Sequence, residues 1–309
     1  MTDPPTSVPA DFRCGYVTIL GAPNVGKSTL MNGLLGQKIS IVTNKPQTTR
    51  HKILGILSTD HYQAIFLDTP GIIKPVYELQ QVMMKSAVAA VRDADVLLFM
   101  IDATTAHAGE DTEHDEAFRL LAHVQAPVFL LINKVDVVAK ESLLPVIEFY
   151  SRKFTFREIF PVSALKKEGT AELAEAIVKL LPLHPPMYPL DIVSELNERF
   201  FVGEIIREKI FLKCHEEIPY STTVDITEFV ERDTGKWLVR AEIYVGRESQ
   251  KGMMIGKGGA MLKEIGRLAR KDIEEFLGHQ VFLDLFVKVR RDWREDPETL
   301  KQLGYRSDT

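Results

Sequence analysis

The chain of 309 residues is long enough for two domains, and its 45% hydrophobic and 26% charged residues are typical of a soluble globular protein. A formal net charge of −5 argues against a protein that coats nucleic acid with its whole surface, and no apolar run approaches the roughly 20 residues that span a bilayer. The two cysteines, Cys14 and Cys214, lack metal-ligand spacing. We therefore expect neither a zinc site nor a disulfide framework, and a cytoplasmic location.

The first part of the chain predicts an α/β domain over residues 14–181, preceded by a disordered arm at 1–13. Continuous apolar stretches such as 96–101 are typical of strands whose two faces are both covered by helices. We expect strands at 16–20, 52–57, 62–68, 95–102, 127–133 and 159–163, and helices at 29–35, 77–92, 113–122, 140–153 and 171–181. This alternation predicts a mixed, mostly parallel sheet with helices on both faces.

A phosphate-binding sequence follows the first expected strand. It fits the pattern G-x-x-x-x-G-K-[ST] between a strand and a helix, and its expected nucleotide-binding residues are Gly21, Ala22, Pro23, Asn24, Val25, Gly26, Lys27, Ser28 and Thr29. The glycines let backbone N–H groups face the phosphates. Lys27 would reach the β- and γ-phosphates, and Ser28 would bind Mg²⁺. By itself the loop does not identify the nucleotide.

The sequence Asn133-Lys134-Val135-Asp136, which follows another apolar strand, indicates guanine. The Asp136 carboxylate can accept two hydrogen bonds from the N1–H and N2–H₂ groups of guanine, whereas adenine offers no matching pair. Asn133 can contact the opposite edge of the base, and the stem of Lys134 can pack over the ring. After the next strand, Ser163 and Ala164 suit a backbone contact to the guanine O6. We therefore expect the ligands to be GTP and GDP.

A metal-binding and switch sequence, Asp68-Thr69-Pro70-Gly71, closes the strand 62–68. Asp68 is placed to hold Mg²⁺ through a water, and the Gly71 N–H can meet the γ-phosphate. Loss of that contact on hydrolysis would release the segment that follows. Together these sequences resemble the five guanine-nucleotide motifs of the translation-factor-related GTPases.

This resemblance implies a first switch at residues 37–52, with a threonine that completes the Mg²⁺ shell. In related GTPases this threonine directly precedes an arginine, which favours Thr49 and leaves Thr48 as the alternative. Small signalling GTPases have a water-orienting glutamine where this chain has Ile72, whose side chain cannot hydrogen-bond. We expect slow hydrolysis, with Lys27, Thr49, Gly71 and Asn24 as the catalytic candidates.

Asn24 connects the phosphate loop with a second cation. In similar GTPases the asparagine at this position helps to hold K⁺, which supplies positive charge near the β- and γ-phosphates. The alternative is a loop residue selected only for its turn geometry. The first interpretation predicts faster hydrolysis in K⁺ than in Na⁺.

Residues 182–190 are rich in proline and predict a linker. The second domain, expected at 191–292, has the order α-β-β-α-α-β: a helix at 191–213, strands at 221–230 and 237–245, two helices joined by Gly256-Lys257-Gly258-Gly259, and a strand at 281–289. Residues 293–309 are expected to form a C-terminal tail.

A G-x-x-G sequence between two helices in this order is typical of a KH domain, which clamps about four nucleotides of single-stranded nucleic acid. We expect RNA to be bound by Gly256, Lys257, Gly258, Gly259, Lys263, Arg267 and Arg270. We expect bases to rest on an apolar groove formed by Met254, Ile255 and Leu262. In an arbitrary protein the same four residues would more often be a simple turn between helices.

Over nearly its full length the chain resembles the Era-type GTPases of bacteria, which join such a GTPase domain to a C-terminal type II KH domain and contain a switch like residues 47–51. The resemblance implies single-stranded RNA near the 3′ end of 16S rRNA as partner, a role in assembly of the 30S subunit, and peripheral contact of part of the protein with the inner face of the cell membrane. No DNA partner is expected. The alternatives are a GTP-gated adaptor whose second domain binds protein or membrane, and a tRNA-modifying GTPase with a reactive cysteine.

Overall fold

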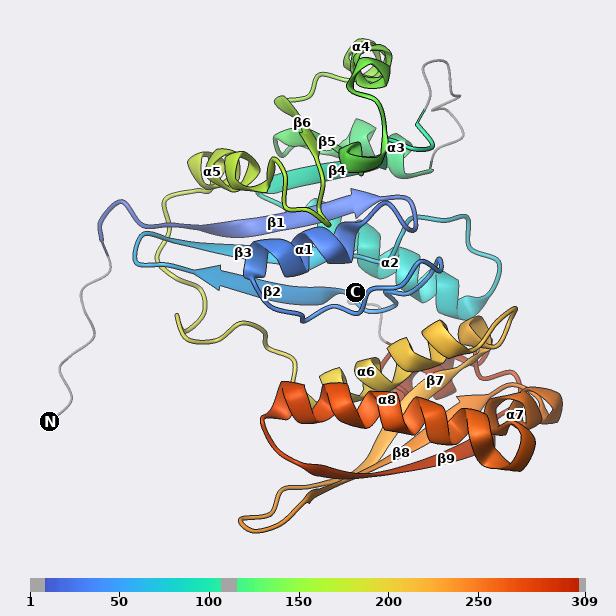
Figure 1. Cartoon of the computed structure of the whole chain (residues 1–309). Helices are drawn as coiled ribbons and strands as arrows, with labels where there is room; N and C mark the ends of the chain where they lie inside the picture. Colours follow the sequence, from blue (N-terminus) through green and yellow to red (C-terminus); the bar gives the residue numbers. More distant parts are fainter. Residues whose placement is uncertain (1–8, 107–115, 306–309) are drawn as a thin grey trace, which may run out of the picture.

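The computed structural model describes residues 9–106 and 116–305 and shows an N-terminal and a C-terminal domain joined by an extended segment (Figure 1). A six-stranded sheet forms the centre of the N-terminal domain, in the order β2-β3-β1-β4-β5-β6. Only β2 runs antiparallel to its neighbour. The strands are β1 (Arg13–Gly21), β2 (Ile53–Ser58), β3 (Tyr62–Asp68), β4 (Val96–Asp102), β5 (Val128–Asn133) and β6 (Glu158–Val162).

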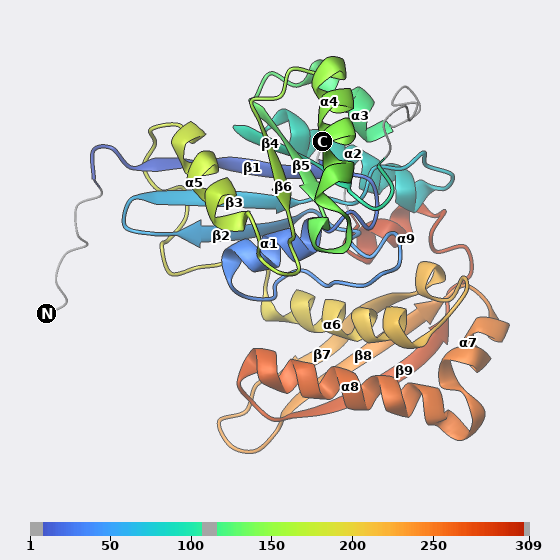
Figure 2. The ribbon, with the colours of Figure 1, turned by 45° about the horizontal axis from the view of Figure 1, so that its top comes forward.

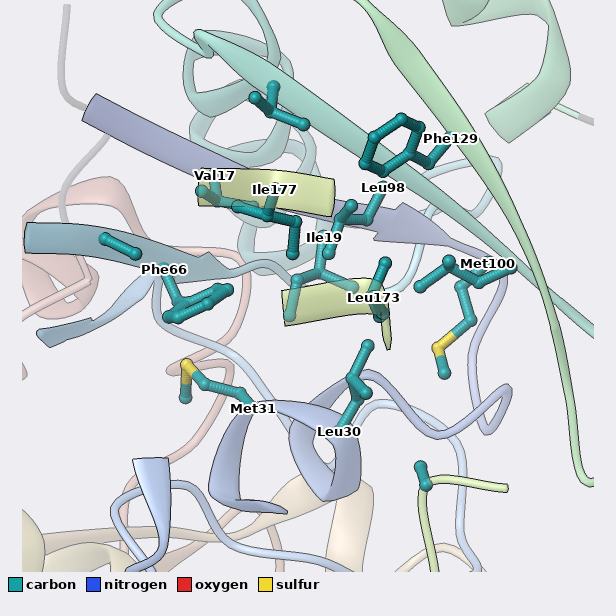
Figure 3. Close-up of a cluster of buried hydrophobic side chains, with 14 of the residues drawn as sticks. Val17, Ile19, Leu30, Met31, Phe66, Leu98, Met100, Phe129, Leu173 and Ile177 are labelled. Atoms are coloured by element: carbon teal, nitrogen blue, oxygen red, sulfur yellow. The ribbon is translucent and has the colours of Figure 1, made fainter. Parts of the chain in front are cut away.

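Helices cover both faces of this sheet, as the apolar strands predict. The helices are α1 (Lys27–Leu35), α2 (Glu78–Arg92), α3 (Glu116–Leu120), α4 (Leu143–Lys153) and α5 (Thr170–Leu180). Leu98 of β4 packs in the same cluster as Leu30 of α1 and Leu173 of α5 (Figure 3). Its neighbour Phe99 packs in the cluster formed with α2, α3 and α4 on the other face. A fully buried side chain of this kind contributes about 2 kcal/mol to stability.

The expected strands and helices of this domain are confirmed to within one or two residues, with three differences. The strand expected at 16–20 is longer, because β1 begins three residues earlier, at Arg13. The helix expected at 140–153 begins with a separate 3₁₀ turn, Lys140–Ser142, before α4. The helix expected at 113–122 begins outside the described residues, and its described part is α3 followed by the 3₁₀ turn Leu121–His123. Most of the arm expected at 1–13 also lies outside them.

The segment between the domains is longer than the linker predicted at 182–190, and the helix expected from residue 191 is wrong in its first seven positions. The helix α6 (Glu198–Lys213) begins only after Asn197, whose side chain accepts a hydrogen bond from the Phe200 N–H at 2.9 Å. Before that point the backbone is held by the N-terminal domain, because the Ile56 N–H of the edge strand β2 donates to the Val193 carbonyl at 2.7 Å. Residues that pair with a strand edge cannot at the same time form a helix.

The C-terminal domain has a three-stranded sheet with three helices packed on one face. β7 (Thr223–Val230) is antiparallel to β8 (Trp237–Val245), and β8 is parallel to β9 (Val281–Val289). The helices are α6, α7 (Glu248–Ile255) and α8 (Ala260–Leu277). The predicted order α-β-β-α-α-β is confirmed. Figures 1 and 2 both show α6 and α8 side by side, with α6 toward the N-terminal domain.

Residues 293–305, which we expected only as a tail, pack between the two domains. The segment includes α9 (Pro297–Gln302), and its side chains Trp293, Leu300 and Tyr305 are buried against α2. The Trp293 indole donates to the Ser221 carbonyl of the C-terminal domain at 3.0 Å. The segment therefore joins the C-terminal domain to the helix that follows the Asp68–Gly71 sequence.

Candidate nucleotide site and nucleic-acid interface

A cavity of about 490 Å³ lies at the carboxyl ends of the parallel strands, where ligands bind in doubly wound sheets. Most of the predicted nucleotide-binding residues line it: Pro23, Asn24, Gly26, Lys27, Ser28, Thr29, Asn133, Lys134, Asp136, Ser163 and Ala164. Thr49 and Gly71 line it too. Four predicted residues do not line it: Gly21, Ala22, Val25 and Asp68.

The side chain of Asn133 joins two loops of the cavity. Its amide nitrogen donates to the Val25 carbonyl at 2.7 Å, and its oxygen accepts from the Ala164 N–H at 2.9 Å. The backbone of Gly26 has φ +105°, and a Cβ there would lie 2.3 Å from the Asn133 amide, so this position requires glycine. Both ends of the amide are thus bonded to protein, which differs from the contact with the base edge that we expected.

Lys27 is buried at the bottom of the cavity. Its ammonium group donates to the carbonyls of Gly21 at 3.1 Å and Ala22 at 2.9 Å. Burial lowers the pKa of Lys27 to about 8, although the charge of Asp68 opposes this shift. A buried cation that is held by carbonyl groups is well placed to exchange them for phosphate oxygens.

Asp68 lies at the centre of a cluster of hydroxyl groups. Its Oδ2 accepts from Ser28 Oγ at 2.6 Å and from Ser40 Oγ at 2.7 Å, and Ser28 Oγ lies 2.9 Å from Thr49 Oγ1. The other oxygen, Oδ1, is buried without a hydrogen-bond partner among the described residues. Burial raises the pKa of this carboxyl, while the hydroxyl groups and Lys27 oppose the shift. Carboxylate and hydroxyl oxygens are the ligands that Mg²⁺ prefers, so the residues present fit this ion.

The structure brings Thr49, and not Thr48, to this cluster. Thr48 Oγ1 donates to the Lys45 carbonyl at 2.7 Å and lies 2.6 Å from Thr43 Oγ1. Ser40 is a member that the sequence reasoning missed. It is held by Asn32 of α1, whose Oδ1 accepts from the Ser40 N–H at 2.9 Å. No sequence pattern marks this pair.

The two remaining catalytic candidates connect the phosphate loop with the switches. Gly71 lies against the loop, and a Cβ there would be 2.7 Å from the backbone of Pro23. The next residue, Ile72, packs into the core and offers no group to orient water, as the sequence predicts. Asn24 donates from Nδ2 to the Asn44 carbonyl of the first switch at 3.1 Å.

Lys134 has a partner that the sequence reasoning also missed. Its ammonium group forms an ion pair with Asp102 at the end of β4. Burial alone would raise the pKa of Asp102, but hydrogen bonds from Lys134 and Thr104 hold it below its usual range. The signal available in sequence was the position of Asp102, which closes a strand directly beside Asn133 in the sheet.

The loop Gly256–Gly259 lies at the start of a second cavity, of about 670 Å³, beside α8. Gly258 and Gly259 have positive φ angles, and nothing lies within 4 Å of a Cβ added to either, so the backbone is open to a ligand. The cavity brings together predicted and unpredicted residues: Gly259, Leu262, Lys263, Arg267, Arg270, Leu283 and Leu285. Lys257, in the same loop, is exposed.

The apolar part of this groove differs from the prediction. Met254 is fully buried against Cys214 in the domain core and cannot support a base. Leu283 and Leu285 of β9 take that place next to Leu262. We expected every apolar groove residue near the glycine loop in sequence, whereas β9 reaches the groove only through the fold. Arg267 is paired with Glu264 at 2.8 Å.

Two family models match the chain: "50S ribosome-binding GTPase" over residues 16–134 and "KH domain" over residues 217–294. The protein "GTPase Era" of Geotalea daltonii is 48% identical over 294 residues, covering 95% of this chain and 98% of the relative. The "GTPase Era" of Lactobacillus helveticus is 45% identical over 295 residues, covering 96% and 97%. This chain belongs to the Era family of GTPases.

Solved structures of Era agree over both domains. A single-residue variant of Aquifex aeolicus Era bound to GDP·AlF4⁻ is 42% identical with a TM-score of 0.90, covering 96% of this chain and 100% of the other. Era in complex with MgGDPNP and nucleotides 1506–1542 of 16S ribosomal RNA is 41% identical with a TM-score of 0.90, covering 96% and 99%. The predicted family, the GTPase and KH folds and the GTPase activity are thereby confirmed. Among the described residues of this Era-family chain, no helix is long and apolar enough to cross a membrane.

Proposed function

We propose that this Era-family GTPase binds Mg²⁺ with GTP or GDP in the first cavity and single-stranded RNA at the second. We propose the 3′ end of 16S rRNA as that RNA and assembly of the 30S subunit as the process. The observation that carries the proposal is the likeness to an Era structure that contains both MgGDPNP and nucleotides 1506–1542 of 16S ribosomal RNA. In this chain Lys27 lines the first cavity and Lys263, Arg267 and Arg270 line the second, so that both present basic groups to phosphates.

In hydrolysis, water attacks the γ-phosphorus, the bond to the β–γ bridging oxygen breaks, and GDP and phosphate leave. Mg²⁺, held by Ser28, Thr49 and, through water, Asp68, would neutralise charge on the β- and γ-phosphates. Lys27 and the N–H groups of the phosphate loop act on the same oxygens. Because Ile72 cannot orient the water, we infer that most of the rate enhancement comes from this stabilisation of charge on the phosphates.

We propose K⁺ as a second cation at Asn24. The Asn24 side chain and the Asn44 carbonyl lie together, and amide and carbonyl oxygens are the ligands that K⁺ binds in proteins. Asn24→Gly removes the side chain while tolerating the observed φ of 65°. We expect hydrolysis by the native protein to be faster in K⁺ than in Na⁺, and the rates of the variant to be equal in both salts. Equal rates in the native protein would exclude the K⁺ site.

RNA binding is tested by adding negative charge to the glycine loop. With Lys257→Asp and Gly258→Asp together, we expect the affinity for a 16S rRNA 3′-end oligonucleotide to fall at least about tenfold, because phosphate contacts dominate such affinities. The matched control is Lys236→Asp, an exposed lysine in the β7–β8 turn. Fluorescence anisotropy at several salt concentrations measures both variants. Unchanged affinity of the loop variant would favour the adaptor function instead.

We further propose, on family resemblance alone, a cytoplasmic protein of which part contacts the inner face of the membrane peripherally. Flotation of the purified full chain with vesicles of anionic lipid tests this contact. Recovery of all the protein in the bottom fraction, away from the floated vesicles, would contradict it.

A further inference from the structure

The first switch is clamped by the C-terminal domain on both sides of Thr49. Before this residue, the Thr48 carbonyl accepts a hydrogen bond from Arg207 Nη2 of α6 at 2.5 Å. After it, the Arg50 guanidinium donates to the carbonyls of Thr222 at 2.7 Å and Pro219 at 2.9 Å. One arginine from each domain thus holds the residue on either side of Thr49, Thr48 through its backbone carbonyl and Arg50 through its side chain.

Both arginines are removed from water, which makes these bonds strong. The exposed fraction is 3% for Arg50 and 1% for Arg207. Arg207 is also paired with Glu204 one turn earlier on α6, with Nε 2.7 Å from Oε1. Burying a guanidinium is unfavourable unless it is paired, so neither side chain can rearrange without losing bonds that water cannot replace inside the interface.

The clamp leaves the Thr49 hydroxyl in the cluster of hydroxyl groups around Asp68. Its Oγ1 lies 2.9 Å from Oγ of Ser28, which belongs to the phosphate loop. A switch that is already ordered loses less conformational entropy when GTP and Mg²⁺ recruit the threonine. GDP lacks the γ-phosphate that draws the first switch inward, so its binding gains little from the same order.

We propose that Arg207 of the second domain is a positioning residue for Thr49, and that it couples domain docking to the preference of the site for GTP over GDP. The proposal rests on the proposed role of Thr49 as a Mg²⁺ ligand. Coupling is reciprocal: a clamp that favours GTP–Mg²⁺ is itself favoured by GTP–Mg²⁺. The second domain thereby contributes to the nucleotide site in addition to binding RNA.

The test replaces the buried ion pair by a neutral pair of similar volume, Glu204→Gln with Arg207→Met, because removing Arg207 alone would leave Glu204 charged and unpaired. The control is Arg199→Met on the same helix, since Arg199 bonds to the Ile226 carbonyl of its own domain. Both full-length variants are compared with the native chain for binding of a non-hydrolysable GTP analogue and of GDP with Mg²⁺. Hydrogen exchange of residues 45–51 is measured without nucleotide.

We expect the double variant to bind the GTP analogue about tenfold more weakly, which is about 1.4 kcal/mol, with GDP affinity unchanged. Exchange at 45–51 should be faster, and Arg199→Met should change neither quantity. Equal losses for both nucleotides, or unchanged exchange with unchanged affinity, would overturn the proposal. Should the double variant not fold, Arg50→Met removes the other half of the clamp and is judged by the same two outcomes.

Thr49→Ala separates this proposal from the proposed function. If Thr49→Ala leaves the GTP-to-GDP preference intact, the assigned role of Thr49 is wrong and the premise fails. If Thr49→Ala reduces the preference but the clamp variants do not, Thr49 is a ligand that Arg207 does not position. If both reduce it, combining them should add little further loss, because they act on one interaction.

Discussion

At the scale of single residues, the nucleotide cavity depends on polar groups that the fold has removed from water. Lys27, Asp68 and Asn133 are all buried, and each hydrogen-bonds to another loop of the cavity or to the phosphate loop itself. Burial shifts the pKa of Lys27 down and that of Asp68 up, which disfavours the charged form of both. In the proposed complex, phosphates and Mg²⁺ would supply the opposite charges, so that ligand binding would relieve both penalties at once.

The lowered pKa of Lys27 predicts a pH dependence of nucleotide binding. In the free protein the ammonium loses its proton as pH rises through about 8, whereas bound phosphates favour the charged form. Affinity for GDP with Mg²⁺ is therefore full below pH 8 and falls above it, by up to about tenfold per pH unit. Calorimetry in two buffers of different ionisation enthalpy should also show proton uptake above pH 8.

Lys27→Arg is the control for this prediction, because arginine stays charged and leaves only the ionisation of guanine itself at higher pH. Affinity of the native protein that is as independent of pH as that of the variant would contradict the pKa shift.

At the scale of elements, the helix α6 and the strand β9 place the functional side chains of the second domain. The helix α6 begins where Asn197 caps it, and it reaches as far as Lys213, placing Arg207 under the first switch. The strand β9 runs parallel to β8 and brings Leu283 and Leu285 to the groove beside α8. The position of each functional side chain thus follows from where its helix or strand begins.

The cap of α6 predicts a stability effect. Asn197→Ala leaves the Phe200 N–H without its side-chain acceptor and should destabilise the protein by about 1 kcal/mol. Asn197→Ser, which retains an acceptor oxygen, should be close to the native protein. Urea unfolding followed by circular dichroism measures both, and an alanine variant as stable as the serine variant would show that the cap is unimportant.

At the scale of the whole molecule, the last described segment of the chain packs against the N-terminal domain. The segment 293–305 packs on α2, and the Leu79 N–H of that helix donates to the Arg294 carbonyl at 2.9 Å. The clamp at Thr48–Arg50 connects the C-terminal domain to the first switch. The segment 293–305 contacts α2, the helix that follows the Asp68–Gly71 sequence. A change in either switch therefore meets the C-terminal domain directly.

The chain's two tryptophans offer a matched test of this interface. Trp293→Ala removes a fully buried ring between the domains and should destabilise their docking by about 3 to 5 kcal/mol. Hydrogen exchange should then rise at residues 79–83 and 294–305. Trp237→Ala, at the outer end of β8, should leave both segments protected. Equal protection in the two variants would show that the segment docks without Trp293.

Short-range chemistry made much of this protein predictable. The phosphate loop, the Asp68–Gly71 and Asn133–Asp136 sequences and the glycine loop at 256–259 each lie between elements whose hydrophobic period could be read locally. Such patterns determine the strand–loop–helix context, the guanine ligand and the order of both domains, because each depends on neighbours within a few residues of the chain.

Only the tertiary structure decided which distant side chains meet. The contact of Ser40 with Asp68, the leucines of β9 in the groove and the burial of Trp293 have no local signal in the sequence. Nor does Arg207, which reaches Thr48 across the domain boundary. Sequence alone determined a GTPase joined to a KH domain. The packing of α6 against the first switch and of the last segment against α2 decided how the two domains are connected, because buried charges must find their partners wherever the fold places them.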